Sequence, residues 1–411
     1  MDYHKILTSH LPITTAPETD TYIFPVSQHI GKPAVPVVIK GEKVKVGQLI
    51  AKAEPGCSAN IHSSVSGEVM DIKDSPHSSG VNTKCIIIKN DNQYTKIKTS
   101  SPKQLKDMTK SQLIQMVEDC GIVGLGGATF PTVIKIKPGK PVEELIINGA
   151  ECEPYLTADH RLMVEYTHDI FVGIEILQKI LEPKKTFIGV EDNKPDAILS
   201  LKKALIRHNN IQIVSLPTKY PQGAEKILVK QITKKRIKKL PIDKGVVVIN
   251  VATAAQIGKS FETGMPLIDR IVTISGEEIN KHHNYLVRIG TPISVLLPEL
   301  KKDLDKTIKV ISGGPMMGVS QHNLDIPVTK GTSGIIVIKN VIKEEGTCSR
   351  CAKCIDNCPL SLMPILAAKK GIQAMDCMEC GLCAYNCPCN INLVQRIRLQ
   401  KIEIMKKGKA S

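Results

Sequence analysis

The chain contains no tryptophan, and aromatic residues make up only 3% of its 411 residues. Proteins that bind nucleic acids by stacking depend on aromatic side chains, so this shortage argues against such a partner. No apolar run reaches the roughly 18 residues that a membrane span needs. The N-terminal region, with Asp2, His4 and Lys5, lacks the apolar core of a secretory signal. We therefore expect no nucleic-acid partner, no direct membrane span and a cytoplasmic location.

Charge of one sign is in excess. Lysine and arginine number 55 against 40 acidic residues, which gives a formal net charge of +15. Such a balance favours acidic partners, among them an anionic membrane face, a phosphorylated cofactor or an acidic redox protein. Charge alone does not choose between them.

Cysteine is abundant, with 13 residues, and the absence of a secretory signal favours thiolate ligands over disulfides. The run CSRCAKCIDNCP begins at Cys348, and CMECGLCAYNCP begins at Cys377. Each has the spacing C-x2-C-x2-C-x3-C-P, in which three cysteines bind one [4Fe-4S] cluster and the fourth binds the other cluster. Zinc knuckles or a metal-free tail are the alternatives, but zinc sites lack this interlocked set of eight thiolates. The predicted ligand sets are Cys348, Cys351, Cys354 and Cys387 for one cluster, and Cys377, Cys380, Cys383 and Cys358 for the other.

The stretch from Pro25 to about Asn90 consists of short β-type runs separated by glycine and proline. Its sequence resembles the barrel-sandwich fold of biotinyl and lipoyl carrier domains. The comparable hairpin tip, residues 56–60, has no lysine that could be modified. We expect a structural version of that fold without a prosthetic group.

From the motif that begins at Gly121 to about Thr253, apolar strand patterns alternate with helical patterns. The strand patterns are residues 144–149, 185–191, 211–216 and 245–251, and the helical patterns are residues 159–181 and 195–208. This alternation is typical of βαβ units on a parallel sheet. Residues 271–297 then predict two strands and the start of a helix, which indicates a small α+β module. The chain is therefore expected to be a multidomain α/β and α+β protein.

A glycine loop, GIVGLGGATFPTVIK, precedes the first predicted strand of this region. Gly124, Gly126 and Gly127 would let backbone N–H groups approach a phosphate or a flat ring, and Lys135 would supply a counter-charge. The loop is neither a Walker A motif nor G-x-G-x-x-G, and a plain turn before a helix is the alternative. Downstream, NGAECEPYLTADHRLM places Glu151 and Glu153 after a strand, where ligands of open α/β sheets bind.

These two motifs, together with PVTKGTSGI and the cysteine repeats, resemble the C subunit of the Rnf electron-transport complex, RnfC. A more distant resemblance is to the NADH-oxidising FMN subunit of respiratory complex I. The resemblance runs from about Val26 to Asn392. It implies an N-terminal arm (1–24), a barrel-sandwich hybrid domain (25–98), a Rossmann-like FMN/NADH-binding domain (105–255), a β-grasp (SLBB) domain (256–330), a dicluster ferredoxin domain (331–400) and a basic tail (401–411).

The resemblance also implies cofactors and their ligands. FMN and NAD(H) join the two [4Fe-4S] clusters, and the partners are Rnf-type membrane and ferredoxin-like subunits. Peripheral attachment to the cytoplasmic face of the membrane follows as an expectation. The implied nucleotide-binding residues are Gly124, Gly126, Gly127, Lys135, Asn148, Glu151, Tyr220, Gly223, Glu225, Asn250 and Thr253 for FMN, and Phe130 and Glu153 for the nicotinamide nucleotide.

Two other functions stay open at this point. The chain lacks the usual Gly-Gly-x-His-Pro segment, as would a soluble relative that delivers NADH electrons to a dedicated reductase such as proline reductase. Leu125 and Ala150 stand where the respiratory relative has Arg and Asp. If these changes abolish nucleotide binding, the chain is an iron-sulfur conduit or scaffold without flavin. The direction of electron flow is also open.

Overall fold

The computed structural model describes residues 4–99, 104–206, 208, 210–237, 239–300, 307–341 and 343–409. Residues 1–3 of the predicted arm and residues 410–411 of the predicted tail thus lie outside it. The chain divides into two compact units. Unit 1 comprises Met1–Gly314 and Val319–Ile338, and unit 2 comprises Pro315–Gly318 and Lys339–Ser411.

The predicted strand-rich region forms two antiparallel sheets in unit 1, with strand orders β2-β8-β7-β4 and β3-β5-β6. Alternate residues of the strands point inward, and the buried set includes Tyr22, Phe24 and Ile50. This arrangement agrees with the predicted barrel-sandwich fold. The strands are β2 (Thr21–Pro25), β3 (Val35–Pro36), β4 (Lys43–Val44), β5 (Leu49–Lys52), β6 (Ile61–His62), β7 (Gly67–Pro76) and β8 (Asn82–Asn90).

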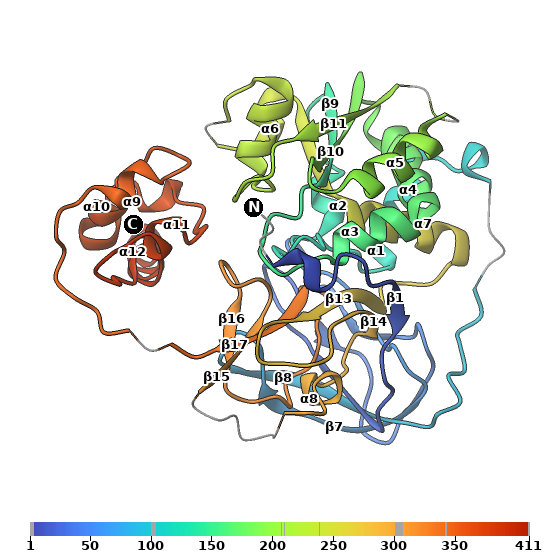
Figure 1. Ribbon diagram of the computed structural model, residues 1–411. Coiled ribbons are helices and arrows are strands. Elements are labelled where there is room, and N and C mark those ends of the chain that lie inside the picture. The colour runs from blue at the N-terminus through green and yellow to red at the C-terminus, as the bar shows by residue number, and fades with distance from the viewer. Residues whose placement is uncertain are drawn as a thin grey trace. The chain divides into compact units, whose positions relative to one another are not determined.

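The predicted parallel sheet is present, with strand order β11-β10-β9-β12 and every pair parallel. One face packs against α1, α3, α4, α5 and α7, and the other packs against α6 (Figure 1). The long predicted helical stretch after β9 is two helices, which meet at Tyr166. The elements are α1 (Lys110–Asp119), α2 (Thr132–Lys135), β9 (Glu144–Gly149), α3 (Ala158–Glu165), α4 (Thr167–Leu181), β10 (Lys185–Glu191), α5 (Pro195–Leu205), β11 (Ile211–Leu216), α6 (Glu225–Thr233), β12 (Val246–Asn250) and α7 (Val251–Thr263).

A third sheet in unit 1 has the order β1-β14-β13-β17-β15-β16. Its first strand comes from the N-terminal arm and pairs in parallel with β14. Its strand β17 pairs with β13 and lies beyond the boundary at residue 330 that the sequence indicated. The elements are β1 (Ile13–Thr15), β13 (Asp269–Ser275), β14 (His283–Arg288), α8 (Ile293–Leu296), β15 (Ile308–Ser312), β16 (Val319–Gln321) and β17 (Gly334–Lys339).

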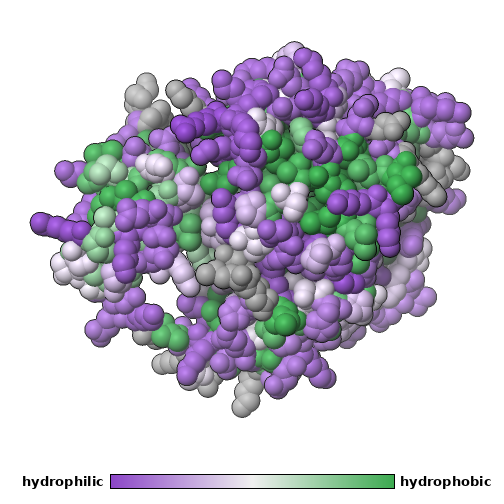
Figure 2. All heavy atoms as spheres, turned by 45° about the horizontal axis from the view of Figure 1, so that its top comes forward, coloured by the Kyte–Doolittle hydropathy of each residue, from purple (hydrophilic) through white to green (hydrophobic). Residues whose placement is uncertain are grey.

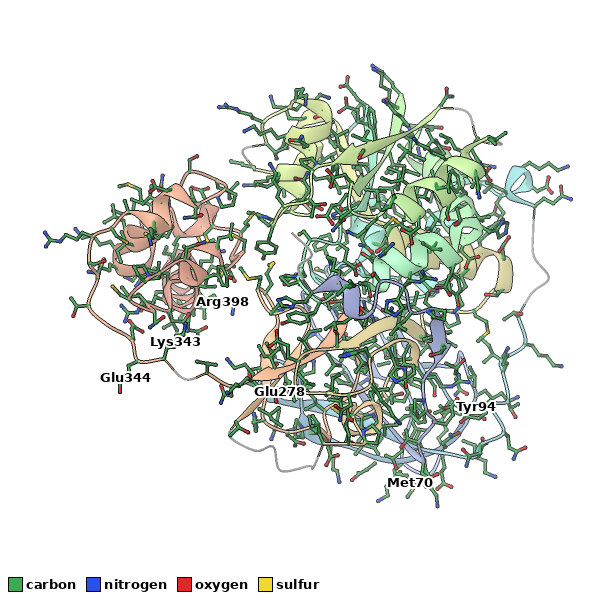
Figure 3. All side chains as sticks on the ribbon, in the orientation of Figure 1. Met70, Tyr94, Glu278, Lys343, Glu344 and Arg398 are labelled. Atoms are coloured by element: carbon green, nitrogen blue, oxygen red, sulfur yellow. The ribbon has the colours of Figure 1, made fainter. Side chains whose placement is uncertain are left out.

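Unit 2 contains the eight cysteines of the repeats. Lys343 and Glu344 lie on the extended segment that follows β17, and Arg398 lies on α12 (Figure 3). Ala367, Ala374, Leu393 and Ile397 form part of its small core. The helices described in this unit are α9 (Lys353–Asp356), α10 (Pro364–Lys370), α11 (Leu382–Tyr385) and α12 (Leu393–Lys409), with the 3-10 helix η4 (Ala374–Asp376). Unit 1 contributes the 3-10 helices η1 (Lys5–Leu7), η2 (Leu105–Asp107) and η3 (Pro241–Lys244) among its described residues.

No helix among the described residues is both long enough and apolar enough to cross a bilayer. Hydrophilic residues cover most of the surface visible in Figure 2, and apolar residues gather in separate patches between them.

Candidate functional site

The two cysteine repeats have the same local backbone. Three residues with positive φ lie at matching places within or just after each repeat, at Arg350, Ala352 and Ser361 for the first and at Glu379, Gly381 and Asn390 for the second. Backbone N–H groups in turns of this kind can form concave anion sites, as in many iron-sulfur sites. Two such contacts are present, from Glu379 N to Cys377 Sγ at 3.3 Å and from Leu362 N to Cys358 Sγ at 3.4 Å.

One predicted ligand set surrounds a cavity in unit 2. Cys358, Cys377, Cys380 and Cys383 all line it, and Leu362, Val394 and Ile397 complete an apolar wall. Burial, followed by the neighbouring thiols, raises the pKa of Cys383 to about 12. Four thiolates in this space therefore need a positively charged group between them. The donor set and its surroundings fit a [4Fe-4S] cluster.

Three cysteines of the second predicted ligand set, Cys348, Cys351 and Cys354, also lie near one another. Burial raises the pKa of the Cys354 thiol, and the nearby Cys348 and Cys351 add to that shift. Cys387 packs against the core of unit 2, and Cys351 is exposed. These residues fit a second cluster that lies closer to solvent in this unit.

The nucleotide site predicted in unit 1 lies at a topological switch point. From β9 the chain moves outward through β10 and β11 and then returns, so that β12 pairs with the other edge of β9. Asn148 and Asn250 lie side by side at the carboxyl ends of these two strands. Open α/β sheets bind ligands in the crevice at such a point.

The glycine loop packs against this end of the sheet. Gly124 N donates to Phe130 O at 2.9 Å, which closes the loop, and Leu125 N donates to Thr253 Oγ1 at 2.9 Å. Gly126 lies so close to Asn250 that a Cβ would be 3.2 Å from its Nδ2. The loop is thus joined to the start of α7, whose N-cap is Asn250.

Two glycines of the loop have room for a side chain. A Cβ at Gly127 would meet no atom within 4 Å, and one at Gly124 would meet none nearer than 3.6 Å. The first turn of α7 offers a positive helix end beside this open backbone. A flat ring over the glycines with its phosphate near α7 fits these residues, so the loop suits a flavin nucleotide.

The other predicted FMN residues form two linked pairs. Asn148 Nδ2 donates to Gly223 O at 2.8 Å, which ties the end of β9 to the loop containing Tyr220. Lys135 forms an ion pair with Glu225 and donates to Val248 O at 3.0 Å. The structure thereby brings together residues that are far apart in the sequence.

Glu151 and Glu153 have different surroundings. The carboxylate of Glu151 is buried and accepts from the N–H groups of Asp159 at 3.0 Å and His160 at 3.1 Å, so it caps α3. The main-chain oxygen of Glu153 accepts from Lys5 Nζ at 2.9 Å, and its carboxyl group lies beside Gly314. Glu151 therefore has a structural task at this end of the sheet that was not expected from the sequence.

No role was assigned from the sequence to Asp159, Arg270 and Lys330, three charged residues near the glycine loop. Asp159 and Lys330 lie within motifs quoted in the sequence analysis. Asp159 accepts from Asn250 Nδ2 at 2.8 Å, and burial together with the nearby Glu151 raises its pKa to about 7. Arg270 donates to Lys330 O and to Leu125 O. Lys330 donates to Gly121 O at 2.7 Å, and burial lowers its pKa to about 7. These contacts connect distant segments, so no local signal could have found them.

Family models match three parts of the chain. The Nuo51 FMN-binding domain matches residues 117–259, the RnfC barrel sandwich hybrid domain matches residues 1–93, and the 4Fe-4S dicluster domain matches residues 340–388. These matches confirm the predicted barrel-sandwich, FMN-binding and dicluster folds.

Curated relatives match along most of the chain. The C subunit of the proton-translocating ferredoxin:NAD(+) oxidoreductase complex of Clostridium ljungdahlii is 44% identical, and the match covers 90% of this chain and 82% of that relative. The Na(+)-translocating counterpart of Acetobacterium woodii is 42% identical, with 98% and 95% covered. A crystal structure of an NAD+-reducing [NiFe]-hydrogenase is similar at 16% identity and a TM-score of 0.49, over 75% of this chain and 60% of that one. On the curated relatives and the matched domains, this chain belongs to the family of the C subunits of Rnf-type ferredoxin:NAD(+) oxidoreductase complexes.

Proposed function

We propose that this protein passes electrons between NAD(H), FMN and two [4Fe-4S] clusters, as the NADH-interacting C subunit of an Rnf-type ferredoxin:NAD(+) oxidoreductase. The observation that carries this proposal is the glycine loop, which is hydrogen-bonded to Thr253 at the switch point of an FMN-binding domain. The same chain supplies eight cysteines in two matching repeats. Its partners are the other subunits of the complex.

In this proposal each group of residues has a separate task. Gly124 and Gly127 leave the backbone open to a flat ring, and Gly126 lets the loop pack closely against Asn250. Asn250 and Thr253 set the start of α7 toward a phosphate. Lys135, held by Glu225, contributes positive charge beside the sheet. When bound, FMN accepts a hydride from NADH and releases electrons one at a time, which lets a two-electron donor supply one-electron clusters.

The remaining assignments concern the edges of the site. Asn148 and Glu151 lie at the end of β9 and could bind hydroxyl groups of the flavin side chain. Tyr220 and Gly223 belong to the loop that Asn148 holds in place. We assign Phe130 and Glu153 to the nicotinamide nucleotide. The domain boundaries remain part of this proposal, namely an arm (1–24), a barrel-sandwich domain (25–98), a nucleotide-binding domain (105–255), a β-grasp domain (256–330), a cluster domain (331–400) and a basic tail (401–411).

The decisive experiment is anaerobic reconstitution with FMN, iron and sulfide, followed by addition of NADH in a stopped-flow spectrophotometer. Flavin absorbance should bleach first and the iron-sulfur absorbance should follow. Glu153→Gln should raise the KM for NADH without loss of iron. A protein that binds FMN fully but is not bleached by NADH would contradict the proposal.

The relatives favour this function over the two alternatives. They are named as subunits of ion-translocating complexes, whereas neither a proline reductase partner nor a flavin-free scaffold finds support among them. We further propose peripheral attachment to the cytoplasmic membrane face. Co-sedimentation with membranes that express the other subunits, and its loss in membranes without them, would test that placement.

A further inference from the structure

A cavity of about 320 Å3 lies in unit 1, outside the glycine loop and the cysteine repeats. It opens between the N-terminal arm and the turn that follows β10. Its polar lining consists of Lys5, Ser9, His10, His160, Asn193, Lys194 and Asp196. Small-molecule sites are commonly of about this size and contain a few convergent polar groups.

Lys5 is a buried ammonium that donates to main-chain oxygens. Its side chain is 5% exposed and donates to Glu153 O at 2.9 Å and Leu156 O at 2.5 Å. No carboxylate within the described part of the chain forms a salt bridge with it. An ammonium has three donors, so one is left for a ligand. The carboxylates of Glu151 and Glu191 attract this charge without forming an ion pair with it, and burial lowers the pKa of Lys5. A bound anion in direct contact would offset the cost of that burial.

A second buried ammonium faces the same cavity. Lys194 is 1% exposed and forms an ion pair with Glu191 at 2.6 Å, and its charge helps to lower the pKa of Lys5, after the larger effect of burial. The first turn of α5 begins at the next residue and adds the positive end of a helix. The one carboxylate in the lining, Asp196, is bound by His160 Nε2 at 2.7 Å.

We propose that this cavity binds a phosphate group, held between the ammonium groups of Lys5 and Lys194. Lysine is a common phosphate ligand, and a phosphate offers enough oxygens for both ammonium groups. The space exceeds that of a bare phosphate and suits a small phosphate-bearing molecule. Since Lys5 also holds the carbonyl of Glu153, the phosphate could be free or could belong to the nicotinamide nucleotide.

Inorganic phosphate is the probe, titrated calorimetrically into the flavin-loaded full chain in a chloride buffer. Saturable binding is expected, and Lys5→Met should weaken it at least tenfold, whereas Lys5→Arg should restore much of it. The matched control is Lys184→Met, because Lys184 is 77% exposed and does not line this cavity. No saturable binding, or equal affinity in Lys5→Met, overturns the proposal.

A second variant leaves the buried lysines in place. Asn193 is exposed, and its Oδ1 accepts from Lys194 Nζ at 3.0 Å. Asn193→Asp keeps that acceptor and adds a negative charge at the cavity, so phosphate affinity should fall at least fivefold. Unchanged affinity in this folded variant also overturns the proposal.

The source of the phosphate is resolved by repeating the titration with saturating NAD+. Competition identifies the nucleotide phosphate, and undiminished affinity identifies a separate phosphate-bearing molecule. The inference is independent of the proposed function. NADH-dependent bleaching in a protein that binds no phosphate would remove the inference and leave the function intact.

Discussion

Substitution of Gly124 by alanine tests whether glycine is needed at this position for folding or for FMN binding. Gly124 does not have a positive φ, and an added Cβ would lie 3.6 Å from Phe130 O, which is ordinary contact. The folded protein alone therefore does not need glycine at this position. Gly127 gives no such clean test, because its φ is +103° and alanine there would be strained.

Gly124→Ala is expected to stabilise the FMN-free protein and to weaken FMN binding. Replacing glycine at a compatible position restricts the unfolded chain and stabilises a protein by about 0.4–1 kcal/mol. A methyl group forced between the loop and a closely packed ring costs about 1–3 kcal/mol. At about 1.4 kcal/mol per tenfold change, FMN affinity should fall about 5- to 150-fold.

Two measurements on the same samples test this reasoning. Thermal denaturation without FMN should show an equal or higher Tm, and quenching of flavin fluorescence should show the weaker binding. Gly346→Ala is the matched control, since a Cβ there meets nothing nearer than 3.7 Å and the residue lies in unit 2. If Gly124→Ala binds FMN as tightly as this control does, the flavin does not lie over Gly124.

Three further predictions concern the clusters, helix packing and pH. Cys383→Ala should remove about half of the iron by breaking one ligand set, while Cys389→Ala should retain it, as iron analysis of anaerobic preparations would show. Gly173→Ala would place a Cβ 1.8 Å from Ala254 O, so α4 and α7 must separate and the Tm should fall; an unchanged Tm would refute their close packing. Because burial raises the pKa of Asp159 from 3.8 to about 7, stability should decline as pH rises through this interval. Asp159→Asn should flatten that decline in denaturation curves recorded from about pH 4 to 8, and an equally steep decline would contradict the assignment.

Local sequence patterns were sufficient for the parallel sheet. The predicted runs 144–149, 185–191 and 211–216 coincide with β9, β10 and β11, because each is an apolar segment bounded by polar or turn residues. The break between α3 and α4 at Tyr166 could not be predicted from the sequence, since apolar residues continue at helical spacing from Leu162 to Ile170. Capping of α3 by Glu151 depends on a tertiary contact that periodicity does not report.

The charged surroundings of the glycine loop could not be predicted for a similar reason. Arg270 and Lys330 donate to main-chain oxygens more than a hundred residues away, and any residue type can supply such an oxygen. Pairing of β1 with β14 likewise involves three residues of no distinctive pattern. The cysteine spacing was more informative, because thiolate ligands are specified by residue type and their order along the chain.

The pairing of β1 with β14 has a consequence for biosynthesis. Ile13 leaves the ribosome early, but its partner Asn284 is made about 270 residues later, a delay on the order of tens of seconds at ordinary rates of synthesis. Strand β1 of the N-terminal arm therefore remains unpaired until most of the polypeptide has been synthesised. The third sheet of unit 1 is therefore completed only after the β14 segment has been translated.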